Sequence, residues 1–142
     1  MPSLDDAAAL ASALPEVTEG ERRGHRTWSV AGKAFTWERP FSQADLRRFG
    51  DEVPPAGPIL AVRTADLADK EAALAAGTKG VFTIPHFDGF AAVLLQLRAV
   101  TKRPLRATIE DAWLACAPPA LARAYLDGGP PPVTPAARRR SR

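Results

Sequence analysis

The sequence has few of the residues that usually build catalytic or metal centres. Cys116 is the only cysteine among 142 residues, which excludes an internal disulfide and a cysteine-based metal cluster. It lies on the apolar stripe of a predicted helix, where a cysteine packs as a small hydrophobic residue. The chain has no glycine-rich phosphate loop, no dinucleotide-binding fingerprint and no nucleophile-elbow motif. We therefore expect a protein that is not an enzyme and that carries no cofactor and no metal.

Histidine is also scarce, with His25 and His86 the only two. Together with Asp88 they make a two-histidine, one-carboxylate set of the kind that binds transition metals. Nothing in the spacing brings His25 near His86, however. The alternative is that His86 and Asp88 hydrogen-bond the backbone of their own turn, Pro85–Gly89. His86 and Asp88 are therefore candidates for a turn or for a ligand site.

Long apolar runs are missing, and none approaches the ~20 residues that cross a bilayer. The first residues include Asp5 and Asp6 and lack a basic segment before an apolar one, so they do not resemble a secretory signal. A single cysteine is compatible with a reducing compartment. We expect a cytoplasmic protein without a membrane partner.

The basic charge of the chain is concentrated at one end. The isoelectric point is about 9.5 and the net charge +3, but residues 128–142 contain four arginines and no acid. Residues 1–127 carry 15 basic and 16 acidic side chains. A nearly neutral body lacks the broad positive surface of a strong phosphate binder. We expect one domain over residues 1–127 and a disordered tail, rich in proline and arginine, over residues 128–142.

The most distinctive stretch, Gly24–Pro40, has the pattern of a β-hairpin. Gly32 takes a positive φ without strain, so the turn is centred on residues 31–32 or on residues 32–33. Alternation of side chains predicts one aromatic face, which should be buried, and one small, polar face. The first face would carry Trp28, Val30, Phe35 and Trp37, and the second Thr27, Ser29, Ala34 and Thr36.

The remaining segments predict an α+β domain. Helices are expected from about residues 4–14, 42–50, 66–77 and 104–117, followed by a short one after Pro118. Further strands are expected over residues 59–63, 81–84 and 91–97, and Glu16–Arg23 reads as a charged connection. The expected fold is a mainly antiparallel five-stranded sheet with helices packed on one face.

Basic side chains cluster in and just before the hairpin. The candidates for contact with nucleic acid are Arg22, Arg23, Arg26, Lys33 and Arg39. A second basic group consists of Arg98, Lys102, Arg103 and Arg106. Glutamates lie among the first group, so a mixed-sign soluble surface is the alternative interpretation.

The order and spacing of several motifs resemble the MmcQ/YjbR family over about residues 4–126. The motifs are Leu14–Glu19, the pattern H-x-x-W-x-V-x-G-K-x-F-x-W over His25–Trp37, Pro85–Phe90 and Glu110–Leu114. The resemblance implies a CyaY-like arrangement, an antiparallel sheet with helices packed on it. Family members are commonly described as DNA-binding proteins with a double-wing fold. The family has no agreed catalytic residues, so the resemblance assigns none to this chain.

The sequence and the resemblance together predict a monomeric, non-enzymatic protein that binds DNA weakly and without sequence specificity. The alternative is a module that binds a protein or a small molecule through the small, polar face of the sheet. An enzyme has the least support, because no acid and base can be placed together from spacing alone.

Overall fold

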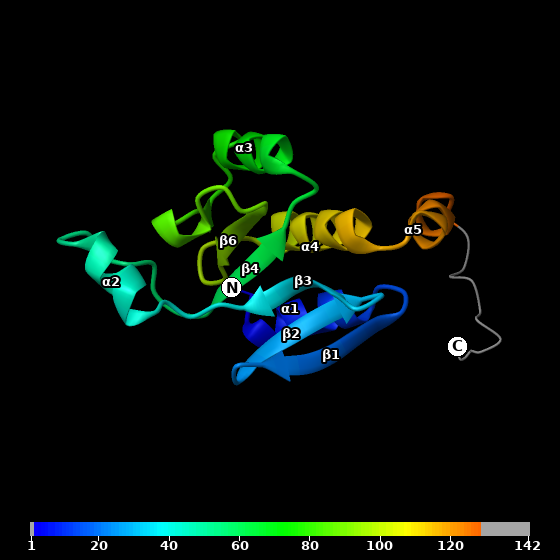
Figure 1. Ribbon diagram of the computed structural model, residues 1–142, viewed down its shortest axis with the longest axis horizontal. Coiled ribbons are helices and arrows are strands. Elements are labelled where there is room, and N and C mark those ends of the chain that lie inside the picture. Colours follow the sequence, from blue (N-terminus) through cyan, green and yellow to red (C-terminus); the bar gives the residue numbers. More distant parts are fainter. Residues whose placement is uncertain (1, 129–142) are drawn as a thin grey trace.

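A six-stranded antiparallel sheet organises the protein, in the strand order β1-β2-β3-β4-β6-β5. The computed structural model describes residues 2–128 (Figure 1). The tail predicted from residue 128 onward lies, except for Gly128, outside the described residues. The strands are β1 (Val17–Arg22), β2 (His25–Val30), β3 (Lys33–Glu38), β4 (Ile59–Arg63), β5 (Val81–Phe82) and β6 (Ala92–Gln96). The helices are α1 (Leu4–Ser12), α2 (Gln43–Phe49), α3 (Leu67–Ala75), α4 (Lys102–Cys116), α5 (Pro119–Leu126) and the short 3-10 helix η1 (Pro85–Phe87).

The α+β class and the antiparallel sheet are confirmed, and α1, α2 and α3 begin where their predicted caps place them, whereas α4 begins at Lys102, two residues before the predicted start. Ser3 and Ser42 each close a capping box with the aspartate three residues on, and Asp66 caps α3. In each case a side-chain oxygen accepts from a backbone N–H that has no partner within the helix. The chain signals these positions locally, which is why they were predictable. None of the helices among residues 2–128 combines the length and apolar character needed to cross a bilayer.

The strand β1 was missed, so the sheet has six strands rather than five. Within the segment Glu16–Arg23, predicted to be a charged connection, Val17–Arg22 pairs with β2. The two strands are joined by a tight turn in which Arg23 and Gly24 have φ values of 53° and 80°. Because β1 is an edge strand whose side chains are mostly exposed, it has none of the apolar alternation that marks a strand in a sequence.

The second correction concerns Trp37, which lies on the opposite face of the sheet from Trp28. The register between β2 and β3 shifts at Trp28/Ser29, so that Thr36 faces Trp28, Ala34 faces Ser29, and Phe35 is the extra residue of a β-bulge. Beyond the bulge the alternation of β3 is inverted. Thr36 is therefore fully buried, with its hydroxyl donating to the carbonyl of Ala61 at 2.7 Å, although it was predicted for the small, polar face.

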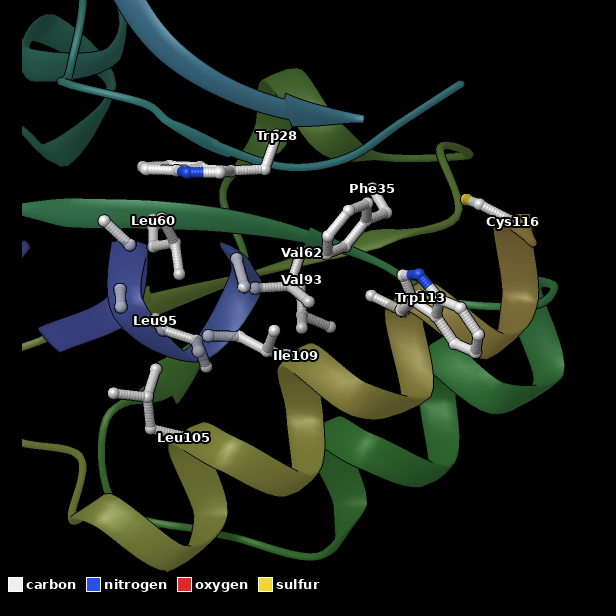
Figure 2. Close-up of a cluster of buried hydrophobic side chains, with 14 of the residues drawn as sticks. Trp28, Phe35, Leu60, Val62, Val93, Leu95, Leu105, Ile109, Trp113 and Cys116 are labelled. Atoms are coloured by element: carbon white, nitrogen blue, oxygen red, sulfur yellow. The ribbon is translucent and has the colours of Figure 1, made fainter. Parts of the chain in front are cut away.

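The main core lies between one face of the sheet and the helices α1, α3 and α4. Trp28, Phe35 and Trp113 are its largest buried side chains (Figure 2). The predicted stripe of α4 is confirmed, with Leu105, Ile109, Ala112, Trp113 and Cys116 all buried. Burial raises the pKa of the Cys116 thiol, which keeps it protonated and unreactive. The turn between β2 and β3 has positive φ at Ala31 (51°) and Gly32 (78°), so these are its central residues.

A smaller apolar cluster lies on the other face of the sheet, over β4 and β6. It contains Ile59, Ala61, Ile84, Phe87, Ala92 and Leu94, and Trp37, Phe41, Phe49 and Phe82 pack against it. The helix α2 contacts η1 and lies apart from the other helices at one end of the molecule (Figure 1). The same face of β1, β2 and β3 contributes no buried apolar side chain to this cluster, and only the partly buried Trp37 packs against it from these strands.

Candidate functional site

A groove of about 990 Å³ lies on the second face of the sheet, over β2 and β3. The floor of the groove comes from the strands through Thr27, Ala34 and Trp37. Its walls come from the turns of the two hairpins, from the segment after β3, from the end of β4 and from the segment around η1. The charged and aromatic side chains that line it are Arg22, Arg23, His25, Lys33, Trp37, Glu38, Arg39, Phe41, Arg63, His86 and Phe90.

In the lining of the groove, basic side chains outnumber acidic ones. Its lining includes five lysine or arginine side chains and a single carboxylate, that of Glu38. Residues 1–127 as a whole carry almost equal numbers of basic and acidic side chains. A concave surface with one sign of charge concentrates the field and attracts ligands of the opposite sign. The neutral composition of the body therefore conceals a local cationic site.

Four of the five predicted nucleic-acid contacts, Arg22, Arg23, Lys33 and Arg39, line the groove. Arg22 is the last residue of β1, Arg23 lies in the turn between β1 and β2, and Lys33 directly follows the turn between β2 and β3. Arg23 holds a φ of 53°, which a glycine or an asparagine adopts at lower cost. A cation thus occupies a backbone position that disfavours a non-glycine residue.

Arg39 is fixed in the wall by contacts on two sides. Its guanidinium forms an ion pair with Asp45 of α2 at 3.0 Å and stacks over the ring of Phe87 at 5.5 Å. Burial raises the pKa of Asp45, but hydrogen bonds from the Ser42 backbone and from Arg39 outweigh it, and the pKa lies below its usual value. Asp45 therefore remains charged, and the ion pair ties α2 to the end of β3.

Arg63 was not among the predicted site residues. Its guanidinium lies over Phe90 at 5.3 Å, and its Nε is buried without a hydrogen-bond partner among residues 2–128. Arg63 is the last residue of β4, directly after an apolar run, and such a run predicts a buried strand rather than a functional site. Its relation to the hairpin depends on the pairing of β3 with β4, which no local signal in the sequence specifies.

Aromatic side chains lie among the cations of the groove. The rings of Trp37 and Phe90 are 6.3 Å apart at a tilt of 48°, and Phe90 is 39% exposed. In its row across the sheet, Trp37 has Thr27 and then Gly20 on one side and Ala61 on the other. These neighbours are small, and a side chain added at Gly20 would meet no atom within 4 Å. The side chains next to the Trp37 indole in this row therefore leave space for a ligand beside it.

The predicted turn at Pro85–Gly89 is present as η1 and the residues after it. His86 lines the groove, as does His25, whereas Asp88 does not. No cluster of three or more potential metal ligands occurs within the described part of the chain. The turn is held by the buried ammonium of Lys70 from α3, which donates to the carbonyls of Phe87 and Phe90, the latter at 2.8 Å. Burial lowers the pKa of Lys70.

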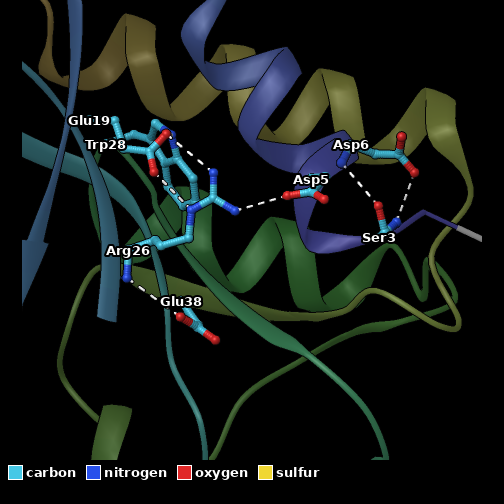
Figure 3. A network of polar contacts seen from close by, with 7 residues as sticks. All are labelled: Ser3, Asp5, Asp6, Glu19, Arg26, Trp28 and Glu38. Carbon is cyan, nitrogen blue, oxygen red and sulfur yellow. Dashed lines mark hydrogen bonds and ion pairs between the residues drawn. The ribbon is translucent and has the colours of Figure 1, made fainter. Parts of the chain in front are cut away.

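Arg26, the fifth predicted contact, lies on the opposite face from the groove. Its guanidinium binds Glu19 at 2.8 Å and Asp5 at 3.1 Å, and it lies over the ring of Trp28 at 5.2 Å. The indole N–H of Trp28 donates to the same Glu19 at 3.1 Å (Figure 3). These bonds raise the pKa of Arg26 further, and they join β1, β2 and α1. Arg26 thus has acidic partners that the groove cations other than Arg39 lack among the described residues.

Two comparisons with known proteins gave no match: no family model matches the chain, and no solved structure matches it significantly. Two relatives are 40% identical to it over 129 residues, which cover 89% of this chain and 97% of each relative. They are named Uncharacterized protein Rv2570, from Mycobacterium tuberculosis (strain ATCC 25618 / H37Rv), and Uncharacterized protein Mb2600, from Mycobacterium bovis. This chain belongs to the same family as these mycobacterial proteins.

Proposed function

We propose that this chain is a non-enzymatic DNA-binding protein of the MmcQ/YjbR type, which acts as a cytoplasmic monomer and holds DNA in the groove. The observation that supports this most is the separation of charge. Five cations and one carboxylate line the groove, on a body whose charges nearly cancel overall. A polyanion is the ligand that such a surface attracts.

The arrangement of the cations fits a chain of phosphates better than a single anion. Lys33 lies at the start of β3, and Arg39 directly follows its end. The intervening residues of an extended strand span ~20 Å. Cations spread over such a length contact successive phosphates, which positions a nucleic acid without reading its bases. Binding of this kind is weak, independent of sequence and sensitive to salt.

The alternative is a small, acidic molecule. The groove volume of about 990 Å³ falls within the range of small-molecule sites, and convergent arginines are suited to carboxylates or phosphates. DNA remains our proposal because five cations exceed what one small anion needs.

The test is a fluorescence anisotropy titration of the full chain with a labelled DNA that has a duplex part and a single-stranded extension. The groove variant combines Arg22→Glu with Lys33→Glu, both at exposed positions. The matched control combines Lys102→Glu with Arg103→Glu, exposed residues outside the groove, and gives the same change of net charge. The arginines after residue 128 are present in every sample, so their contribution is constant.

We expect the groove variant to lose about tenfold or more in affinity at low salt, because repulsion replaces two phosphate contacts. The affinity of the control variant should stay within about threefold of that of the wild type, because charges outside the groove are screened from the bound DNA by salt. Equal losses in both variants would assign the binding to overall charge. No binding by the wild type would remove the proposal and favour the small-molecule alternative.

A further inference from the structure

We propose that the groove is specific for single-stranded nucleic acid, whose bases stack on Trp37 and Phe90 while its phosphates contact the surrounding cations. This inference rests on the proposed function and narrows it. It assigns a role to the aromatic residues, which phosphate contact alone leaves unexplained.

The strand register places Trp37 between two groups of cations. Arg22 is paired with His25 in the row at one end of the groove, which is also the end nearest Arg39. Trp37 lies in the next row, with Thr27, Gly20 and Ala61. Arg63, two residues beyond Ala61 on β4, lies one row further on. A single-stranded nucleic acid that crosses these rows therefore meets first Arg22 and Arg39, then the indole of Trp37, and then Arg63.

Phe90 extends the aromatic surface toward Arg63. Its ring is 39% exposed, lies 6.3 Å from that of Trp37, and is covered on one side by the Arg63 guanidinium at 5.3 Å. The backbone carbonyl of Phe90 is fixed by Lys70, so the ring is presented from an anchored turn. Aromatic rings beside cations in a groove are the features by which proteins bind single strands without reading their sequence.

A duplex fits this surface less well. Its bases are stacked on one another inside the helix and cannot reach Trp37 or Phe90. Reading of a duplex groove requires an element that protrudes, such as a helix or a two-stranded ribbon. Here the aromatic and cationic side chains surround a hollow instead. Bases that are unpaired and splayed out can enter such a hollow and stack.

The chain contains its own reporter for this contact. Trp28 and Trp113 are fully buried, at 0% exposure, and lie in the main core, whereas Trp37 lines the groove. Quenching of tryptophan fluorescence by a stacked base therefore reports on Trp37. The variant Trp37→Phe should bind nearly as well as the wild type without the quenching, because an aromatic ring is retained.

The experiment titrates the full chain with oligothymidylate and with a mixed-sequence duplex of the same length, following anisotropy and tryptophan fluorescence. We expect the single strand to bind about tenfold more tightly and to quench the fluorescence. A plot of the logarithm of its affinity against the logarithm of the salt concentration should have a slope of about −0.7 for each phosphate contacted. Trp37→Leu should weaken binding of the single strand about tenfold, with little change in the salt slope, since a stacking contact and not a phosphate contact is lost.

Phe90→Leu provides a second variant in case Trp37→Leu disturbs the sheet, and a thermal melt identifies any variant that fails to fold. If the chain binds neither the single strand nor the duplex, the proposed function itself is overturned. A duplex bound as tightly as the single strand, without quenching, would leave the proposed function standing and overturn this inference. Binding of the single strand that is unchanged in both Trp37→Leu and Phe90→Leu would overturn it as well.

Discussion

The two faces of β1, β2 and β3 use the same three strands for opposite purposes. On one face Trp28, Val30 and Phe35 are buried under helices, and Arg26 is neutralised by Glu19 and Asp5. On the other face small residues and Trp37 form the floor of a groove, and four of the five predicted cations gather around it. Arg26 is therefore held by fixed carboxylates on one face, whereas Arg22 and Arg23 on the other have no ion-pair partner among the described residues.

This comparison shows that charge composition is a poor guide to charge placement. The body is neutral overall, yet Arg26 is paired with two acids on the helix-covered face, whereas in the groove the cations other than Arg39 have no ion-pair partner among the described residues. Paired charges stabilise the fold modestly, whereas separated charges remain available for a ligand. The following predictions are ordered from the largest expected effect to the smallest.

Replacement of Trp28 by Ala should have the largest effect on stability. The side chain is completely buried and bonded to Glu19, so its loss leaves a large cavity and should cost ~3–5 kcal/mol. Trp37→Ala, on the groove face, should cost less than half as much because Trp37 is only partly buried. Urea denaturation of both variants measures the difference. Equal losses would mean that the two faces are energetically alike.

Replacement of Lys70 by Met should loosen the η1 turn. The ammonium is the donor to two carbonyls, and its removal leaves them without that partner, at a cost of ~1–3 kcal/mol. Hydrogen exchange should increase around residues 85–90 more than in β4 and β6. Lys79→Met, at an exposed position, is the control and should change neither quantity. Uniform exchange across the sheet would show that Lys70 serves the whole fold and not the groove wall.

Replacement of Arg23 by Gly should stabilise the protein while weakening oligonucleotide binding. A left-handed conformation costs a non-glycine residue ~1–2 kcal/mol. The greater conformational entropy of glycine in the unfolded chain offsets ~0.5–1 kcal/mol of this, so the free energy of unfolding should rise by about 0.5–1 kcal/mol. Ala31→Gly, at the matching position of the other turn, should stabilise to a similar extent with binding unchanged. Thermal melts and titrations together test the pair, and a loss of binding in both variants would contradict the assignment of Arg23.

Acid should weaken the network on the helix-covered face. The hydrogen bond from Arg26 holds the pKa of Glu19 below its ordinary value of 4.5 in the folded protein. The stabilisation is therefore present above the unfolded-state pKa and is lost as the pH falls through the lower, folded-state value. The pair is partly exposed, so the effect is at most ~1 kcal/mol. Melting temperatures from about pH 6 to about pH 3 should fall less in Glu19→Gln than in the wild type, and parallel curves would contradict this.

Local signals made much of the fold predictable. Ser42 and Asp66 mark helix starts through their caps, and the spacing of Leu105, Ile109 and Trp113 fixes the buried side of α4. The strands β4 and β6 are short apolar runs because both of their faces are covered. These features depend on a few neighbouring residues, so the sequence alone specifies them.

The features that were not predicted depend on contacts between distant residues. β1 is polar because it is an edge, and only its partner β2 makes it a strand. Likewise, the presence of Arg63 in the row next to that of Trp37 depends on the pairing of β3 with β4. The predicted cations Arg22, Arg23, Lys33 and Arg39 were found from their clustering in the sequence. Arg26 was grouped with them by the same clustering, although alternation along β2 places it on the face of Trp28.

The bulge at Phe35 makes the length of β3 as important as its composition. One extra residue sets the parity of everything that follows on the strand, so Trp37 and Arg39 reach the groove because Phe35 has no partner on β2. Deletion of a single residue there would send the indole toward the core and Thr36 toward the groove. Between residues 33 and 39 an insertion or deletion should therefore disrupt the protein more than a conservative substitution, because it changes the face on which every later residue of the strand lies.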